Sequence, residues 1–198
     1  MAMLTSRQLR IAKAVVFILC LLPLTYIVYA ALTENLGTDP VKSLIHITGE
    51  WAIRLFVLTM AISPMRAWLG WGWALRFRRM LGLYTWFYAT IHLLIVTTYI
   101  FAWDWQLAKI ELAERAYIFV GFAAWVLMMP LGLTSNNRAV RALRKNWGRL
   151  HMLVYPAVLL AWLHIAWQVR SSYFDAVLYA VLIICLLFQR FQKLKKRL

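Results

Sequence analysis

The stretch AVVFILCLLPLTYIVYAAL, residues 14–32, contains no charged side chain. At a rise of about 1.5 Å per residue it forms a helix of about 28 Å, which matches the hydrocarbon core of a bilayer. The later apolar segments are 44–62, 80–103, 116–134, 150–169 and 175–190. Glu50 and Arg54 interrupt the segment 44–62, and the last segment is shorter than the others.

The composition supports a membrane protein and excludes several other classes. Of the 198 residues, 64% are hydrophobic and 15% are charged, and the formal net charge is +15. A soluble domain carries about 25% charged residues, so a soluble globular enzyme, a disordered tail and a disulfide-rich secreted domain are excluded. We predict an all-α membrane protein in which one domain, residues 1–198, forms a bundle of six transmembrane helices.

The basic residues orient this bundle. Four segments hold 17 Lys and Arg residues and no acid: 1–13, 63–79, 135–149 and 190–198. The loops between them hold four basic and six acidic residues. By the positive-inside rule, the basic segments and both termini are cytoplasmic. The net charge is therefore a topology signal, and it does not indicate a nucleic-acid partner.

Two histidines on different predicted helices have about the same expected depth. His92 lies 13 residues after Arg79 and His164 lies 15 residues after Arg149, which gives rises of about 20 and 22 Å. An ionisable residue inside a bilayer is a functional candidate by default. Two neutral imidazoles in a bundle core suit the iron of a six-coordinate b-type haem. The alternatives are a structural hydrogen bond between helices and another metal, although nothing nearby supplies the further ligands of a zinc site.

The other two histidines fall near the ends of predicted helices. His151 lies two residues after Arg149, at the cytoplasmic interface. There it is solvated, or it ligates a second haem or contacts a flavin or quinone. No histidine low on 80–103 faces it, so a second bis-histidine haem is not supported. In a continuous helix His46 lies about 30 Å from Arg66, near the outer surface. It either lines a quinol or partner-protein site or caps the helix end.

Four charged residues complete the set of candidates. Glu50 and Arg54 are spaced i, i+4, which favours an ion pair that neutralises both charges within the bundle. The sharper alternative is that Arg54 binds a haem propionate. Arg78 and Arg79 are explained mostly by topology, and they could also bind a flavin phosphate or lipid headgroups.

Several short strings between about residues 20 and 170 resemble one family. They are LGTDPVK at 36–42 with HITG at 46–49, RRMLGL at 78–83 leading to His92, LTS at 133–135, and Trp147 with LH at 150–151, Tyr155 and His164. The family is the haem-binding membrane subunit, MsrQ or YedZ, of the bacterial periplasmic protein-methionine-sulfoxide reductase system. It belongs to the ferric-reductase-like transmembrane superfamily.

The resemblance implies a six-helix b-type cytochrome in the bacterial inner membrane, with an associated FMN. It implies that electrons pass from respiratory quinol to a periplasmic molybdopterin-containing methionine-sulfoxide reductase subunit, the other half of a heterodimer, which performs the catalysis. The family's haem-related histidines map to His92, His151 and His164. The fused FAD and NADPH domain of the wider superfamily is missing, and only one of its two third-helix histidines is present. Direct NADPH oxidation is therefore not expected.

We predict a membrane electron-transfer subunit in which His92 and His164 are the axial ligands of haem b. No catalytic residue is assigned to the chain itself. Two rival interpretations stand beside this one: a cytochrome b anchor of a different oxidoreductase, and a small polar-substrate transporter. A haem spectrum separates the transporter, and co-purification of the periplasmic partner separates the other anchor.

Overall fold

The computed structural model describes residues 5–168 and 173–195, and these residues form helices and no strand. The chain divides into two compact units, Met1–Val96 and Thr97–Leu198. We call them the first and the second unit and describe each by itself.

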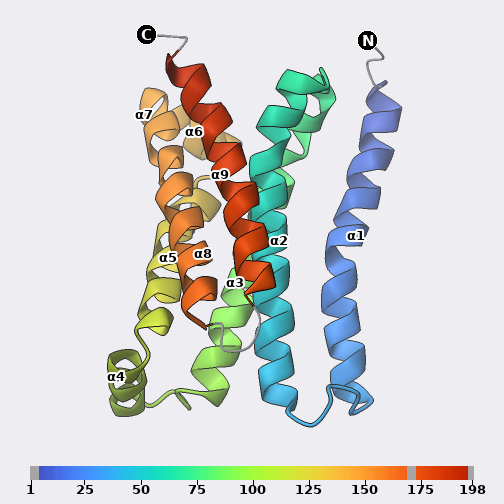
Figure 1. The fold of residues 1–198 in the computed structure, drawn as a ribbon. Helices are drawn as coiled ribbons and strands as arrows, with labels where there is room; N and C mark the ends of the chain where they lie inside the picture. The colour runs from blue at the N-terminus through green and yellow to red at the C-terminus, as the bar shows by residue number, and fades with distance from the viewer. Residues whose placement is uncertain (1–4, 169–172, 196–198) are drawn as a thin grey trace. The chain divides into compact units, whose positions relative to one another are not determined.

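The first unit is built from three long helices and one short 3-10 helix (Figure 1). Its elements are α1 (Ser6–Leu32), α2 (Pro40–Trp68), η1 (Gly72–Arg76) and α3 (Arg78–Tyr99), the last of which ends in the second unit. A capping box starts α1, because the Gln8 N–H donates to the Thr5 hydroxyl and the Thr5 N–H donates to the Gln8 side chain. The Asp39 carboxylate caps α2 by accepting from the Lys42 N–H at 3.0 Å. Polar residues just outside the apolar runs therefore fix where these helices begin.

Two tyrosines of α3 bind the backbone of α1. The Tyr84 hydroxyl donates to the Phe17 carbonyl at 3.1 Å. The Tyr88 hydroxyl, which is fully buried, donates to the Cys20 carbonyl at 2.7 Å and accepts from the Leu24 N–H at 3.2 Å. These bonds fix the register of α1 against α3 at the centre of the unit. The surrounding core consists of Cys20, Leu55, Ile62, Ala74, Phe77, Leu81, Tyr84 and Tyr88.

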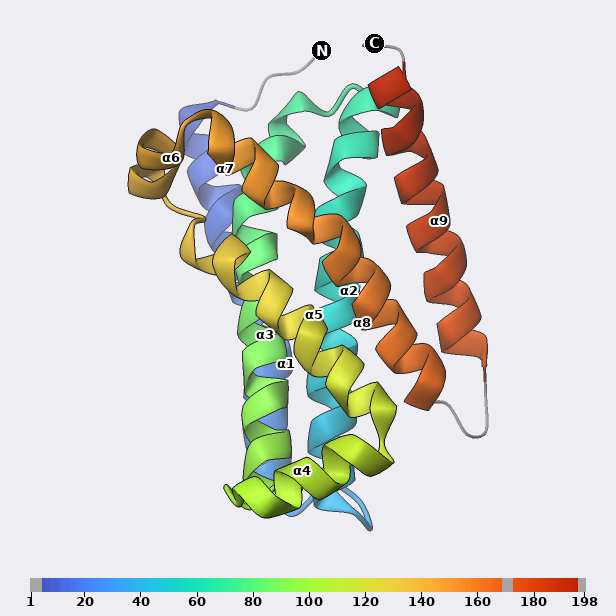
Figure 2. The same cartoon turned by 90° about the vertical axis from the view of Figure 1, so that its left-hand side faces the viewer.

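The second unit is a close helix pair with a third helix beside it. Its elements are α4 (Trp105–Glu114), α5 (Ala116–Leu133), α6 (Asn137–Leu143), α7 (Lys145–Leu150), η2 (His151–Leu153), α8 (Val154–Gln168) and α9 (Phe174–Lys195). α5 packs along α8, where the small side chains of Ala124 and Ala157 are buried. The Trp162 indole N–H on α8 donates to the Ala176 carbonyl on α9 at 2.9 Å. Figure 2 shows α4 lying across one end of α5.

Five helical segments are long and apolar enough to cross a membrane: α1, α2, α3, α5 and the run Lys145–Gln168, which joins α7, η2 and α8. The sixth predicted segment, 175–190, falls within α9. Four statements therefore stay predictions: that this segment crosses the membrane, that the chain has six spans, that both termini are cytoplasmic, and that the chain is a single domain. Residue 169 of the predicted segment 150–169 lies outside the described residues. So do three basic residues of the charge count: Arg170, Lys196 and Arg197.

Some helix bounds differ from those predicted. α3 ends at Tyr99, because Ala102 and Trp103 take positive φ angles of 49° and 58°, which no α-helix accommodates. The predicted segment 150–169 is not one α-helix. Its first residue, Leu150, ends α7, the 3-10 turn η2 follows, and α8 starts only at Val154. Short α4 was not predicted, because charged residues break its apolar pattern.

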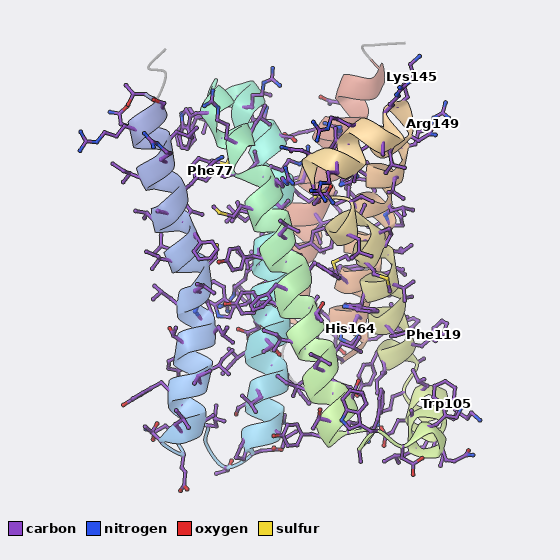
Figure 3. The ribbon with its side chains drawn as sticks, turned by 180° about the vertical axis from the view of Figure 1, so that it is seen from behind. Phe77, Trp105, Phe119, Lys145, Arg149 and His164 are labelled. Carbon is purple, nitrogen blue, oxygen red and sulfur yellow. The ribbon has the colours of Figure 1, made fainter. Side chains whose placement is uncertain are left out.

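Each unit by itself gathers basic residues at one end. In the first unit, α1 begins, α2 ends and α3 begins at the same end (Figure 1), which brings the N-terminal arginines together with Arg66, Arg76 and Arg79. In the second unit, Lys145 and Arg149 lie at the end opposite to Trp105 (Figure 3). This arrangement agrees with the alternation of basic and acidic segments along the sequence.

Candidate functional site

His92 is held by the neighbouring helix of its own unit. Its Nδ1 lies 3.0 Å from the Ile45 carbonyl oxygen on α2 and 3.4 Å from the Thr48 hydroxyl. A carbonyl oxygen only accepts, so this hydrogen bond requires the proton on Nδ1. In the neutral ring the lone pair is then on Nε2, which is the nitrogen able to ligate a metal. The half-buried ring of His92 is therefore oriented as a metal-ligating histidine is.

A glycine of α2 makes room for this imidazole. A Cβ atom added to Gly49 would lie 3.2 Å from both Cε1 and Nδ1 of His92. Such contacts are tighter than most real Cβ contacts, so the ring would have to move by a few tenths of an ångström.

His164 is held in the same manner within the second unit, and Figure 3 labels its side chain. Its Nδ1 lies 2.7 Å from the Tyr117 carbonyl oxygen on α5, which again requires the proton on Nδ1. A Cβ atom added to Gly121 would lie 2.6 Å from Nδ1 and 2.8 Å from Cε1 of His164. No side chain larger than hydrogen fits at this position without a shift of the ring or the helix.

The first turn of α5, which supplies the carbonyl to His164, is itself held by Arg115. A hydrogen bond to the Tyr117 side chain and the nearby Glu111 carboxylate raise the pKa of the Arg115 guanidinium. The Arg115 Nε lies 3.0 Å from a Glu111 carboxylate oxygen. Arg115 therefore stays charged and links α4 to the start of α5.

His151 has a different setting, because its ring bonds to and stacks on a residue of its own segment. Its Nδ1 lies 3.2 Å from the Trp147 carbonyl oxygen, four residues earlier. Its ring stacks on the Trp147 indole with the ring centres 3.9 Å apart. The Trp147 N–H donates to the Thr134 carbonyl at 3.1 Å, which attaches this pair to the end of α5. Its position at the cytoplasmic interface and its role as a haem ligand both stay predictions.

The charged candidates lie on α2 and at the start of α3. Glu50 and Arg54 form the ion pair that their spacing predicts, at 2.7 Å and with about half of each side chain exposed. Arg54 also lies over the Trp51 ring, 5.3 Å from its centre. Arg78 is half-buried and Arg79 is exposed. His46 is exposed in the second turn of α2. Binding of a propionate, a phosphate or a quinol by any of these residues stays a prediction.

The predicted partners His92 and His164 belong to different units, so their pairing stays a prediction, while each ring is oriented within its own unit as a metal-ligating histidine is. Each has a proton on Nδ1, a lone pair on Nε2 and a glycine at the ring.

α3 also has a buried donor, the Trp86 indole N–H, which makes no hydrogen bond to the described residues. Within the described part of the chain, no three His, Cys, Asp or Glu side chains gather as a metal cluster would require.

Sequence reasoning missed the residues that position the two histidines. Gly49 and Gly121 were not singled out, because a glycine inside an apolar helix has many explanations. The Ile45 and Tyr117 backbone carbonyls leave no mark in side-chain chemistry. One signal was available, since the separation from glycine to histidine along the chain is the same in both cases.

Comparison with known proteins identifies the family. Residues 14–162 match the family described as ferric reductase like transmembrane component. Three relatives, all named "Protein-methionine-sulfoxide reductase heme-binding subunit MsrQ", cover most of the chain. The protein from Xanthomonas axonopodis pv. citri is 44% identical over 189 residues, which are 92% of this chain and 87% of that protein. The protein from Xanthomonas oryzae pv. oryzae is 42% identical over 200 residues, or 98% and 92% of the two chains. The protein from Azospira oryzae is 38% identical over 188 residues, or 92% and 79%.

No solved structure matches the chain. The family match covers most of the sequence, and the two Xanthomonas relatives are more than 40% identical to the chain over at least 92% of its length. The chain therefore belongs to the ferric reductase like transmembrane components and, among them, to the family of MsrQ heme-binding subunits.

Proposed function

We propose that this chain is the haem b-binding electron-transfer subunit of a methionine-sulfoxide reductase system. The observation that carries the proposal is the state of two histidines on apolar helices. Each donates Nδ1–H to a carbonyl of a neighbouring helix and so has its lone pair on Nε2. The relatives' names, which include both haem binding and methionine-sulfoxide reductase, support the same conclusion.

In this proposal His92 and His164 would hold the iron of one haem b through their Nε2 atoms. Bound there, the haem supplies a one-electron Fe(III)/Fe(II) couple. The Ile45 and Tyr117 carbonyls orient the rings and fix their tautomers. By accepting from Nδ1–H they also make Nε2 more basic. A more basic ligand favours the ferric state, so these bonds lower the reduction potential.

We further propose that electrons enter from respiratory quinol and leave to a periplasmic molybdopterin-containing subunit that forms a heterodimer with this chain in the bacterial inner membrane. Methionine sulfoxide is reduced on that partner in this proposal, and no catalytic residue is assigned to this chain. The basic end of the first unit is the proposed place for an FMN phosphate, with Arg78 and Arg79 as its contacts. His151, stacked on Trp147 in the second unit, is the candidate for contact with the flavin or with a second haem.

Arg54 is the proposed contact of a haem propionate, but its ion pair makes this a weaker assignment. The Glu50 carboxylate already neutralises Arg54 at 2.7 Å. A propionate would have to compete with Glu50 or share the guanidinium, which has donors for two carboxylates. An Arg54→Gln variant that shifts the haem potential supports this contact. An unchanged potential leaves only the ion pair.

The decisive experiment is a visible spectrum of the full-length protein purified in detergent. We expect dithionite-reducible b-type bands that disappear in His92→Ala and in His164→Ala. His46→Ala is the matched control, because His46 is exposed on the same helix as the Ile45 carbonyl, and it should keep the bands. Absence of the bands in the unmodified protein contradicts the proposal. Unchanged spectra in either of the first two variants reject the axial pair.

Two further measurements address the donor side. FMN released by denaturation is quantified by fluorescence, and we expect it to fall when Arg78 and Arg79 are both replaced by Gln. His151→Ala is assayed for haem content and for reduction by a quinol analogue. If both stay at the unmodified level, His151 is an interfacial residue without a cofactor role.

A further inference from the structure

The two units hold their histidines with the same arrangement at the same spacing. The accepting carbonyl precedes its histidine by 47 residues in both units, from Ile45 to His92 and from Tyr117 to His164. The glycine at the ring, Gly49 or Gly121, lies four positions after the carbonyl in each case. The carbonyl, the glycine and the histidine of the second unit therefore all lie the same number of residues after their counterparts in the first.

The lengths of the connecting segments do not impose this recurrence. In the first unit, a short connection with one 3-10 helix joins α2 to α3. In the second unit, α6, α7 and η2 stand between α5 and α8. Two different connections thus place a histidine opposite a carbonyl and a glycine of the neighbouring helix. The two units share this contact and not the connection that leads to it.

Helix geometry explains why the glycine must follow the carbonyl by four residues. Residues i and i+4 lie one above the other on the same face of a helix, because a turn takes 3.6 residues. A ring that donates to the carbonyl of residue i from the side therefore covers residue i+4. Only glycine leaves the ring in place without a shift, and the distances of 3.2 Å at Gly49 and 2.6 Å at Gly121 make that shift small at the first position and large at the second.

We propose that Gly49 and Gly121 are positioning residues, which keep His92 and His164 bonded through Nδ1 to the backbone and present Nε2 to the haem iron. This inference rests on the proposed function. A larger residue at either position would push the imidazole away from its carbonyl. The histidine would lose both its fixed orientation and the bond that makes Nε2 basic.

The distances predict unequal effects for the two glycines. Gly121→Ala places Cβ within 2.8 Å of two ring atoms of His164, so the ring must leave its position. We expect haem affinity to fall by about 10–100-fold, the usual loss when a metal ligand's outer hydrogen bond is removed. Gly49→Ala needs a displacement of only a few tenths of an ångström. We expect this variant to keep its haem but to show an increased midpoint potential and shifted low-spin EPR g-values.

The matched control is Gly82→Ala, which changes a glycine inside α3. The added Cβ would meet only the Thr59 methyl group at 3.6 Å, an ordinary contact. This variant should keep the affinity, potential and EPR spectrum of the unmodified protein. Gly49→Ala is the informative variant if Gly121→Ala does not fold, because its expected displacement is small.

A purely structural role for the glycines has a different signature. If they serve only close helix packing, both alanine variants lower the thermal stability of the haem-free protein. The potential and g-values of the loaded Gly49→Ala protein then equal those of the Gly82→Ala control, and that result overturns the inference.

The same set of proteins separates this inference from the proposed function. If His92→Ala and His164→Ala lose the haem bands while both glycine variants match the control, the inference fails and the proposed function stands. If the histidine variants keep the unmodified spectrum, the proposed function fails whatever the glycine variants show.

Discussion

The two histidine-bearing helix pairs, α2 with α3 and α5 with α8, share one arrangement but differ in how tightly they enforce it. In the second unit the Nδ1-to-carbonyl distance is 2.7 Å, and the glycine position has no spare room. In the first unit the distance is 3.0 Å, the glycine position is looser, and the Thr48 hydroxyl lies 3.4 Å from the same Nδ1. Thr48 directly precedes Gly49, whereas the residue before Gly121 is Val120, which has no hydroxyl. The second unit thus relies on packing where the first adds a polar contact.

The third helix of each unit is attached differently as well. Two tyrosines of α3 make three hydrogen bonds to the α1 backbone. In the second unit, one indole, that of Trp162, donates to the α9 backbone at 2.9 Å. In both units the attachment comes from an aromatic side chain of the histidine helix. The first unit is therefore expected to depend more on hydrogen bonds, and the second more on the fit between α5 and α8.

The largest effect is expected from Tyr88→Phe. Removing this hydroxyl deprives the Cys20 carbonyl and the Leu24 N–H of a partner in a buried site. Each buried group left unsatisfied costs about 1–3 kcal/mol, and partial repair within α1 reduces the sum. We expect the free energy of unfolding, measured by denaturant titration in mixed micelles, to fall by about 1–3 kcal/mol. Tyr84→Phe, which loses one longer bond, is the control and should lose less. Equal losses would contradict a special role for Tyr88.

Trp162→Phe should have a smaller effect, confined to the second unit. One hydrogen bond to the Ala176 carbonyl is lost, at a net cost of about 0.5–1.5 kcal/mol. Hydrogen–deuterium exchange should increase in the first turns of α9 and stay unchanged in α1. If exchange increases equally in α1, the two attachments are not independent.

The ion pair of α2 comes next in size. Its side chains are about half exposed, and i, i+4 pairs of this kind contribute about 0.3–0.5 kcal/mol. A double-mutant cycle with Glu50→Gln and Arg54→Gln should return a coupling energy in that range. A coupling energy near zero would mean that the two side chains do not interact in the membrane.

The smallest effect is expected from Thr48→Val, which gives the first unit the residue found at the matching place in the second. The Thr48 hydroxyl donates chiefly to the Leu44 carbonyl at 2.7 Å, so His92 keeps its bond to Ile45. Haem content should stay unchanged, and a redox titration should show only a slight shift of the midpoint potential. Loss of haem from this variant would make Thr48 part of the holding arrangement.

The sequence was sufficient for the long helices, because charge-free runs such as 14–32 and 116–134 have few alternatives. It was not sufficient for the end of α3, since the left-handed backbone of Ala102 and Trp103 has no residue signature comparable to glycine. The histidines could be found because ionisable groups are conspicuous among apolar ones. The groups that hold them are two carbonyls and two glycines, whose meaning depends on which helix packs against them.

The bonds made by Tyr88 have a consequence for how the protein is inserted during synthesis. α1 contains Pro23, and the backbone groups of Cys20 and Leu24 on either side of it are bound by a hydroxyl 64 residues beyond Leu24. At about 5–20 residues per second, that hydroxyl is made about 3–13 s later. Until then α1 rests in the bilayer without the two hydrogen bonds that this hydroxyl makes to its backbone. The first membrane-spanning helix, α1, thus reaches its final set of hydrogen bonds only after α3 has been synthesised.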